Sequence, residues 1–165
     1  MTRISGLLLD TDVIVELRSP RPHAAVVDFL RRRRHLRIFV SALSIGELHL
    51  VSRENEQYQD VDAWLQEFRN SYSSNILPVD ADVATVWGPM LSNTEVSAVD
   101  SLVAATAILN SLSIVSGNVE VYRNFAVQTT NPWIAEARAT AEVPPLLPSR
   151  ARQAQPSSAR SDLTS

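Results

Sequence analysis

Four residues with oxygen-bearing side chains occur in positions typical of a chemical site. Asp10 directly follows three leucines, and Asn118 comes shortly after a second strand-like segment. Glu47 lies within an otherwise apolar stretch, and Asp100 comes one helical turn before a run of small residues. Three carboxylates and a carboxamide form an oxygen-only set, which suits Mg²⁺ or Mn²⁺ and not zinc. Such metal sites can activate a bound water for attack on a phosphodiester.

Each carboxylate also has an ordinary structural interpretation. Asp10 can simply cap the helix that follows it, and Glu47 can be an exposed helix-forming residue. Asp100 is on a face of close-packed small residues, where an unpaired carboxylate is costly. It therefore needs a cation, several hydrogen bonds or a cleft. Taken one at a time, the residues leave capping and catalysis both open.

The segments that would position these residues alternate between strands and helices. Leu7 to Leu9 suits a strand buried on both faces. Further strands are predicted at 36–40, 75–79, 113–116 and 125–128, and helices at 13–18, 23–35, 42–53, 54–71, around 83–87 and at 96–110. This order predicts an α/β fold with a mostly parallel sheet of about five strands and helices on both faces. The four polar residues would then meet at the carboxyl edge of the sheet.

Several local signals mark the helix boundaries. Asp80 is predicted to cap the helix that contains Trp87, and Gly88-Pro89 is predicted to interrupt it. The sequence Ser92-Asn93-Thr94-Glu95 has the form of a capping box that starts the next helix.

The composition is that of a single globular domain. The chain has 165 residues, a formal net charge of −3, no cysteine, and 15 basic residues that are all arginine. The absence of cysteine excludes disulfides and thiolate zinc sites, and with no apolar run long enough for a membrane it favours a cytoplasmic location. The negative charge argues against nonspecific coating of nucleic acid. The composition predicts a folded domain over 1–138 and a disordered tail over 139–165.

Five segments of the chain match known motifs in their family order. They are Leu8-Leu9-Asp10-Thr11-Asp12-Val13-Ile14 with Glu16-Leu17, the segment 41–48, the segment from Asp100 to Ala107, Ser116-Gly117-Asn118, and Asn131-Pro132-Trp133. Together these segments resemble the PIN-domain ribonucleases of the VapC toxin type. The resemblance implies a three-layer α/β/α PIN-like fold.

The resemblance also implies a function. It implies a Mg²⁺- or Mn²⁺-dependent endoribonuclease that hydrolyses RNA and pairs with a small VapB-type antitoxin, and a homodimer is common in the family. Asp10, Glu47 and Asp100 correspond to the metal-binding acids. Thr11 and Ser116 would orient acids or water as hydrogen-bonding neighbours.

This chain departs from the family motif at the position of the fourth acid. The family commonly reads Thr-Arg-Asn-x-x-Asp-Phe, whereas Gly117 stands here at the arginine position and Val121 at the aspartate position. One hypothesis is that Glu120 swings in, or that Asn118 and Asp12 supply oxygen ligands, with Asp12 standing where the family usually has Asn. The alternative is a site with one ligand fewer and reduced or lost activity. A PIN fold that binds RNA or protein without cutting, or a housekeeping PIN nuclease, are the other functional hypotheses.

Arginines would select the RNA. Four of them, Arg31, Arg32, Arg33 and Arg34, end a predicted helix. They can stabilise the negative helix terminus or contact RNA phosphates. Arg18 and Arg53 are further candidates for RNA contact.

Overall fold

The computed structural model describes residues 5–54, 61–91 and 96–134. In this part of the chain, five parallel strands form one sheet in the order β3-β2-β1-β4-β5. The strands are β1 (Gly6–Leu9), β2 (Arg37–Ser41), β3 (Ile76–Leu77), β4 (Leu112–Val115) and β5 (Thr129–Thr130). The predicted α/β fold with a parallel sheet is confirmed.

Strand β1 lies at the centre of the sheet, and all of its residues are buried. It pairs with β2 on one side and with β4 on the other. Leu7 and Leu9 pack into a core on one face of the sheet, and Leu8 packs into a core on the other face. Successive side chains of a strand point to opposite faces of the sheet. Because both faces are covered here, the strand has apolar residues at three consecutive positions.

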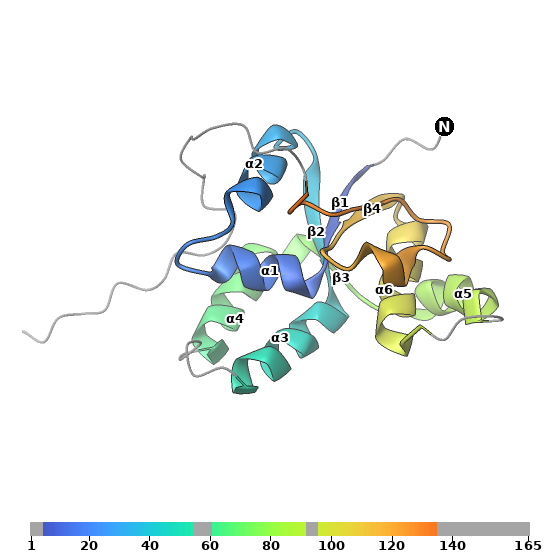
Figure 1. The fold of residues 1–165 in the computed structure, drawn as a ribbon. Helices are drawn as coiled ribbons and strands as arrows, with labels where there is room; N and C mark the ends of the chain where they lie inside the picture. Colours follow the sequence, from blue (N-terminus) through green and yellow to red (C-terminus); the bar gives the residue numbers. More distant parts are fainter. Residues whose placement is uncertain (1–4, 55–60, 92–95, 135–165) are drawn as a thin grey trace, which may run out of the picture.

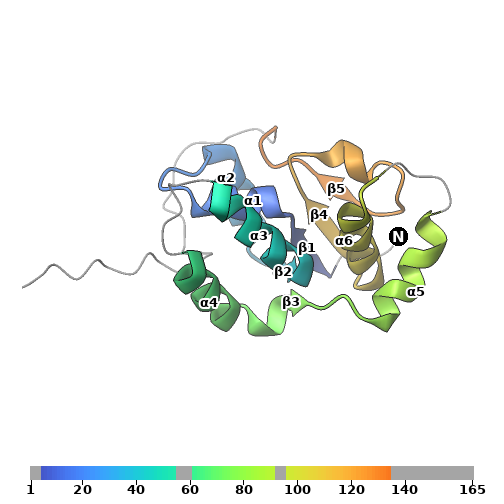
Figure 2. The same ribbon diagram turned by 90° about the horizontal axis from the view of Figure 1, so that it is seen from below.

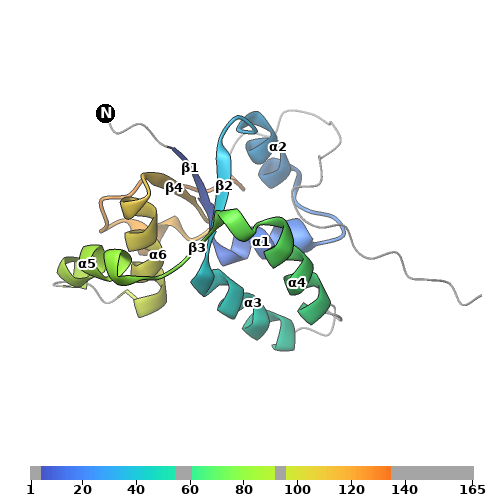
Figure 3. The same cartoon turned by 180° about the vertical axis from the view of Figure 1, so that it is seen from behind.

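Helices cover both faces of the sheet (Figures 1 and 3). On one face lie α1 (Thr11–Arg18), α2 (Ala24–Arg32), α3 (Ala42–Glu54) and α4 (Val61–Ser71), and on the other lie α5 (Ala81–Met90) and α6 (Ala98–Leu109). Figure 2 shows the two groups separated by the strands. Among the described residues, the short 3₁₀ helix η2 (Ser73–Asn75) directly precedes β3, and the short 3₁₀ helix η4 (Val119–Tyr122) lies between β4 and β5.

Helix α6 packs closely against the sheet because its inner face is made of small residues. Ala104, Ala105 and Ala107 have no exposed surface. Its other neighbour is α5, from which the indole N–H of Trp87 donates a hydrogen bond to the Ser101 hydroxyl at 2.9 Å. These contacts fix the first turn of α6, which carries Asp100.

The structure corrects two helix boundaries. The predicted interruption at Gly88-Pro89 is wrong, because α5 continues through Pro89 to Met90. Proline lies in the last turn of this helix, and packing along α6 offsets the cost of the lost hydrogen bond. Helix α6 is capped by Ser97, whose hydroxyl accepts the Asp100 N–H, so the helix begins later than the predicted residue 96. The predicted box at 92–95 lies outside the described residues.

The predicted fifth strand is displaced along the chain. Pairing with β4 begins where the Gln128 carbonyl accepts the Ile114 N–H, and β5 is Thr129–Thr130, not 125–128. Phe125 is buried because its ring belongs to the core, without strand pairing. The predicted start of a helix at 54 is wrong, because Glu54 is the last residue of α3. Residues 55–60, which precede α4, and the predicted tail from 139 lie outside the described part. Within the described part, no helix is long and apolar enough to span a membrane.

Candidate active site

Asp10 and Ser116 are neighbours at the carboxyl edge of the sheet. They directly follow Leu9 of β1 and Val115 of β4, which are partners in the register. The Asp10 N–H donates to the Val115 carbonyl at 3.0 Å, which extends the pairing by one residue. Open parallel sheets keep their ligand sites at this edge.

Asp10 is both a helix cap and a member of an acidic cluster. Its Oδ1 accepts the Thr11 N–H at 2.9 Å at the start of α1. Its Oδ2 accepts the hydroxyl of Tyr122 at 2.8 Å. The two interpretations of Asp10 left open by the sequence are therefore compatible.

Glu47 faces Asp10 from helix α3. Its Oε2 accepts a hydrogen bond from the Thr11 hydroxyl. Burial raises the pKa of the Glu47 carboxyl, the Thr11 hydrogen bond lowers it, and the negative charges of Asp10 and Asp100 raise it further. The structure thus brings the three predicted acids near enough to repel one another.

Asp100 lies in the first turn of α6, where the helix dipole favours a negative charge. Its Oδ2 accepts the Ser97 hydroxyl at 2.6 Å, and its N–H donates to the same hydroxyl at 3.1 Å. The negative charge of Asp100 also raises the pKa of the Tyr122 hydroxyl, so this carboxylate lies near the phenol that bonds to Asp10.

Asp12 is directed at the end of β4. Its Oδ2 accepts the Gly117 N–H at 2.7 Å, and its Oδ1 accepts the Val13 N–H at 2.7 Å. The residue as a whole is exposed, but its carboxylate lies against β4, and this burial raises its pKa. The Asp10 charge raises that pKa further, whereas hydrogen bonds from Gly117, Val13 and Ser116 lower it.

This cluster fits a hard cation in its chemistry. Its donors are carboxylate oxygens, and no ion pair among the described residues joins Asp10, Asp12, Glu47 or Asp100 to an arginine or histidine. A cation would relieve their mutual repulsion. In the described part of the chain, no three acidic or histidine side chains are close enough to form a ligand group as they stand.

Replacing Glu47 with glutamine should stabilise the metal-free protein at neutral pH. The folded-state pKa of Glu47 lies above its ordinary value of 4.5, so ionisation of this carboxyl destabilises the folded protein increasingly as the pH rises above 4.5, and fully above the folded-state pKa. We expect Glu47→Gln to raise Tm by a few degrees at pH 7 in EDTA, and the difference to vanish below pH 4. The exposed Glu67→Gln on α4 is the control. A lower Tm for Glu47→Gln at pH 7 would contradict the predicted repulsion.

The residues proposed to replace the missing acid are differently placed. Glu120 is exposed and forms an ion pair with Arg123. Asn118 is exposed, and its N–H donates to the Ser116 hydroxyl at 3.0 Å. Val121 packs against the core around Leu8. The position where the family carries its fourth acid is therefore part of the apolar core here.

The RNA cleavage implied by the family resemblance should stay within about twofold of wild type in Glu120→Gln, because Glu120 is held by Arg123 at the surface. Exposed ion pairs of this kind contribute only about 0–1 kcal/mol. Cleavage rates at several Mn²⁺ concentrations measure the effect. A raised Mn²⁺ requirement in Glu120→Gln would instead make Glu120 the fourth acid.

Tyr122 is a site residue that sequence reasoning missed. It is 1% exposed, and its hydroxyl bonds directly to Asp10. Burial and the Asp10 charge raise the pKa of this hydroxyl, so it remains a donor. One signal was present in the sequence: a tyrosine stands where the family motif ends in phenylalanine, which adds one polar atom to a core position.

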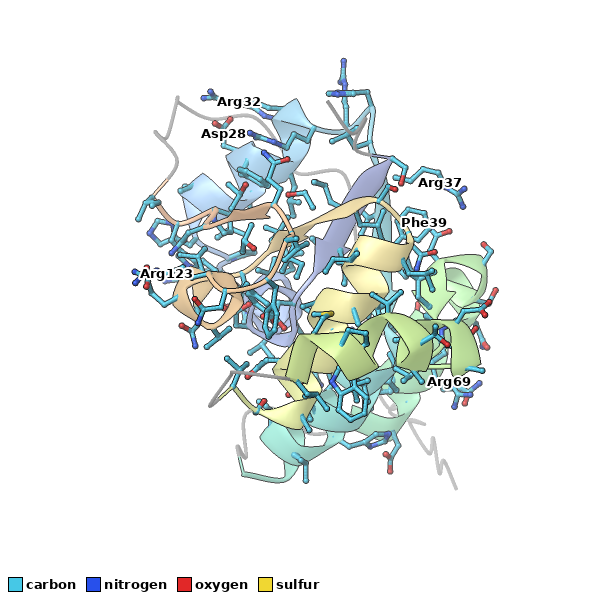
Figure 4. The ribbon with its side chains drawn as sticks, turned by 90° about the vertical axis from the view of Figure 1, so that its right-hand side faces the viewer. Asp28, Arg32, Arg37, Phe39, Arg69 and Arg123 are labelled. Atoms are coloured by element: carbon cyan, nitrogen blue, oxygen red, sulfur yellow. The ribbon has the colours of Figure 1, made fainter. Side chains whose placement is uncertain are left out.

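The arginine cluster lies at the opposite edge of the sheet. Arg32 pairs with Asp28 of α2 (Figure 4), and Arg31 pairs with the same carboxylate. The Arg33 guanidinium lies 3.8 Å from the centroid of the Phe29 ring. These residues precede β2, so they are near its amino end, whereas the acids are at the carboxyl ends. Contact between this arginine cluster and RNA stays a prediction. RNA contact by Arg18, which lies over the Trp64 ring, and by Arg53, whose side chain is outside the described part, also stays a prediction.

A pocket of about 680 Å³ opens beside the acids. It shares Thr11, Asp12 and Gly117 with the site. The rest of its lining is Val15, Glu16, Val51, Asn131 and Trp133. The Asn131 side chain ties this wall to β4, since it donates to the Gly117 carbonyl and accepts the Trp133 N–H, both at 2.9 Å.

Comparison with known proteins identifies the family of this chain. Residues 7–126 match the family model of the PIN domain. The chain therefore belongs to the PIN domain family, as its motifs predicted.

Individual relatives extend over most of the chain. Toxin FitB of Neisseria gonorrhoeae is 28% identical over 139 residues, which cover 77% of this chain and 98% of that protein. VapC ribonuclease Y4jK of Sinorhizobium fredii is 21% identical over 138 residues, covering 77% and 97%. The solved structure of FitAcB from N. gonorrhoeae has a TM-score of 0.66 at 29% identity and covers 78% of this chain and 99% of its own. VapBC2 from Rickettsia felis bound to a promoter DNA fragment, with a TM-score of 0.60 at 16% identity, covers 76% and 97% and is similar in fold.

Proposed function

We propose that this protein is a metal-dependent endoribonuclease and the toxin of a toxin–antitoxin pair. The observation that carries the proposal is that Glu47 lies near enough to Asp10 and Asp100, in a PIN-domain fold, for their negative charges to raise its pKa. The relatives named as a toxin and a VapC ribonuclease support the activity. The neighbours solved as FitAB and VapBC complexes support a small VapB-type antitoxin as partner.

In this mechanism, Asp10, Glu47 and Asp100 would hold Mg²⁺ or Mn²⁺. A bound ion of this kind lowers the pKa of water and neutralises charge on the scissile phosphate. Each carboxylate accepts a hydrogen bond that orients it. The Thr11 N–H donates to Asp10, the Thr11 hydroxyl donates to Glu47, and the Ser97 hydroxyl donates to Asp100. In the reaction, the water oxygen bonds to phosphorus and the 3′ oxygen leaves. The predicted cytoplasmic location agrees with an RNA substrate, and the predicted homodimer stays a prediction.

The test is metal removal from protein purified free of antitoxin. We expect RNA cleavage with Mn²⁺ or Mg²⁺, complete loss in EDTA, and recovery when Mn²⁺ is added in excess. The products should be followed on labelled RNA of defined sequence. Cleavage that persists in EDTA would contradict a metal-dependent mechanism.

A second candidate is a PIN-fold module that binds RNA or protein without cutting. Val121 favours it, because a partly buried apolar side chain that packs against the core occupies the position of the fourth acid. Induction in a bacterial host separates the two candidates. Growth arrest that Asp10→Ala abolishes supports the nuclease, whereas no arrest together with metal-independent RNA binding supports the binding module.

A further inference from the structure

The hydrogen bond between Tyr122 and Asp10 joins the second core to the acidic cluster. The Tyr122 ring is buried in the core that contains Leu8 and Phe125, and its hydroxyl is 2.8 Å from Asp10 Oδ2. Its neighbour Val121 packs against the same core. At the position where the family motif commonly has aspartate, this chain has the apolar Val121. The next residue, Tyr122, has a phenol hydroxyl that bonds to Asp10.

The Tyr122 hydroxyl provides a second hydrogen bond that holds the Asp10 carboxylate in place. The Thr11 N–H already holds Oδ1 at 2.9 Å, and the Tyr122 hydroxyl holds Oδ2 from the opposite side of the sheet edge. Held at both oxygens, the carboxylate cannot rotate without breaking a hydrogen bond. Each carboxylate oxygen has two acceptor positions, so one on each remains for a cation.

We propose that Tyr122 is a positioning residue, whose hydroxyl holds Asp10 in the orientation that binds the divalent cation. The proposal rests on the proposed function. The hydroxyl donates its hydrogen to Asp10, so Tyr122 acts through that carboxylate and is not a ligand. In metal sites, partners that orient a ligand typically contribute 10–100-fold in metal affinity.

The first arm of the test measures Mn²⁺ affinity, by electron paramagnetic resonance of free Mn²⁺. Tyr122→Phe keeps the ring in the core and removes only the hydroxyl. We expect about 10–100-fold weaker Mn²⁺ binding. Tyr72→Phe is the matched control, because Tyr72 is partly buried, stacks on Phe68 and directly follows α4, away from the acids. It should bind Mn²⁺ like wild type. Unchanged affinity in Tyr122→Phe, or equal losses in both variants, overturns the proposal.

The second arm tests the hydrogen bond itself in EDTA. The near-ultraviolet band of Tyr122 is isolated by subtracting the spectrum of Tyr122→Phe from that of wild type. In an Asp10→Asn background, the same subtraction should give a band at shorter wavelength, because the phenol has lost a charged acceptor. An unshifted band overturns the proposal. A shifted band without any Mn²⁺ binding by wild type contradicts the proposed function, and the positioning role with it.

Discussion

Replacing Asp10 with asparagine should reduce RNA cleavage by about a thousandfold while the protein stays folded. Asn removes the charge that the cation needs, and metal-assisted charge stabilisation amounts to several kcal/mol, at about 1.4 kcal/mol per factor of ten. Asn is as good a helix cap as Asp, so α1 should keep its start. Cleavage should be measured over a range of Mn²⁺ concentrations, with circular dichroism as the measure of folding.

Asp80→Asn is the matched control for this experiment. Asp80 caps α5 as Asp10 caps α1, since its Oδ1 accepts the N–H groups of Asp82 and Val83. The substitution is therefore chemically identical but lies outside the acidic cluster. Asp100→Asn should resemble Asp10→Asn in its loss of activity. Full cleavage by either site variant, or a loss in Asp80→Asn as large as in Asp10→Asn, would remove the site assignment.

The features that could be predicted from sequence are those in which neighbouring residues decide the outcome. Leu7 to Leu9 required burial on two faces, and the structure places them in two cores. Asp80 was recognisable as a cap because capping is local. The three acids could be placed together because the carboxyl ends of parallel strands meet at one edge.

The features that could not be predicted depend on contacts between distant segments. Pro89 stays within α5 because α6 packs beside it. Phe125 reads as a strand residue, but its burial comes from the core, and pairing with β4 starts four residues later. The bond between Tyr122 and Asp10 spans 112 positions of sequence, so no local pattern contains it.

The departures from the family motif form a connected set. Gly117 stands at the arginine position, and its N–H binds Asp12, which stands where the family usually has Asn. Trp133 packs over the same glycine. A side chain at 117 would therefore meet both Asp12 and Trp133.

Gly117→Ala should destabilise the protein by about 1–3 kcal/mol, the usual cost of inserting a carbon into a packed site. A Cβ at this position would lie 2.9 Å from Asp12 Oδ2 and 3.1 Å from the Trp133 ring. No glycine in the described part has a positive φ, so the alanine backbone itself is allowed and the cost comes from crowding. Urea unfolding in EDTA measures the change.

Gly88→Ala should shift stability in the opposite direction. A Cβ at 88 meets nothing within 4 Å, and glycine inside a helix is less stable than alanine by roughly 0.5–1 kcal/mol.

Measuring Gly117→Ala in an Asp12→Ala background identifies whether Asp12 or Trp133 crowds the new methyl group. If the carboxylate is the obstacle, Gly117→Ala should cost clearly less once Asp12 has been truncated, because the two changes share one contact and are not additive. If Gly117→Ala lowers stability equally in wild type and in Asp12→Ala, the crowding comes from Trp133. If Gly117→Ala is as stable as wild type, the packing of Asp12 against β4 is refuted.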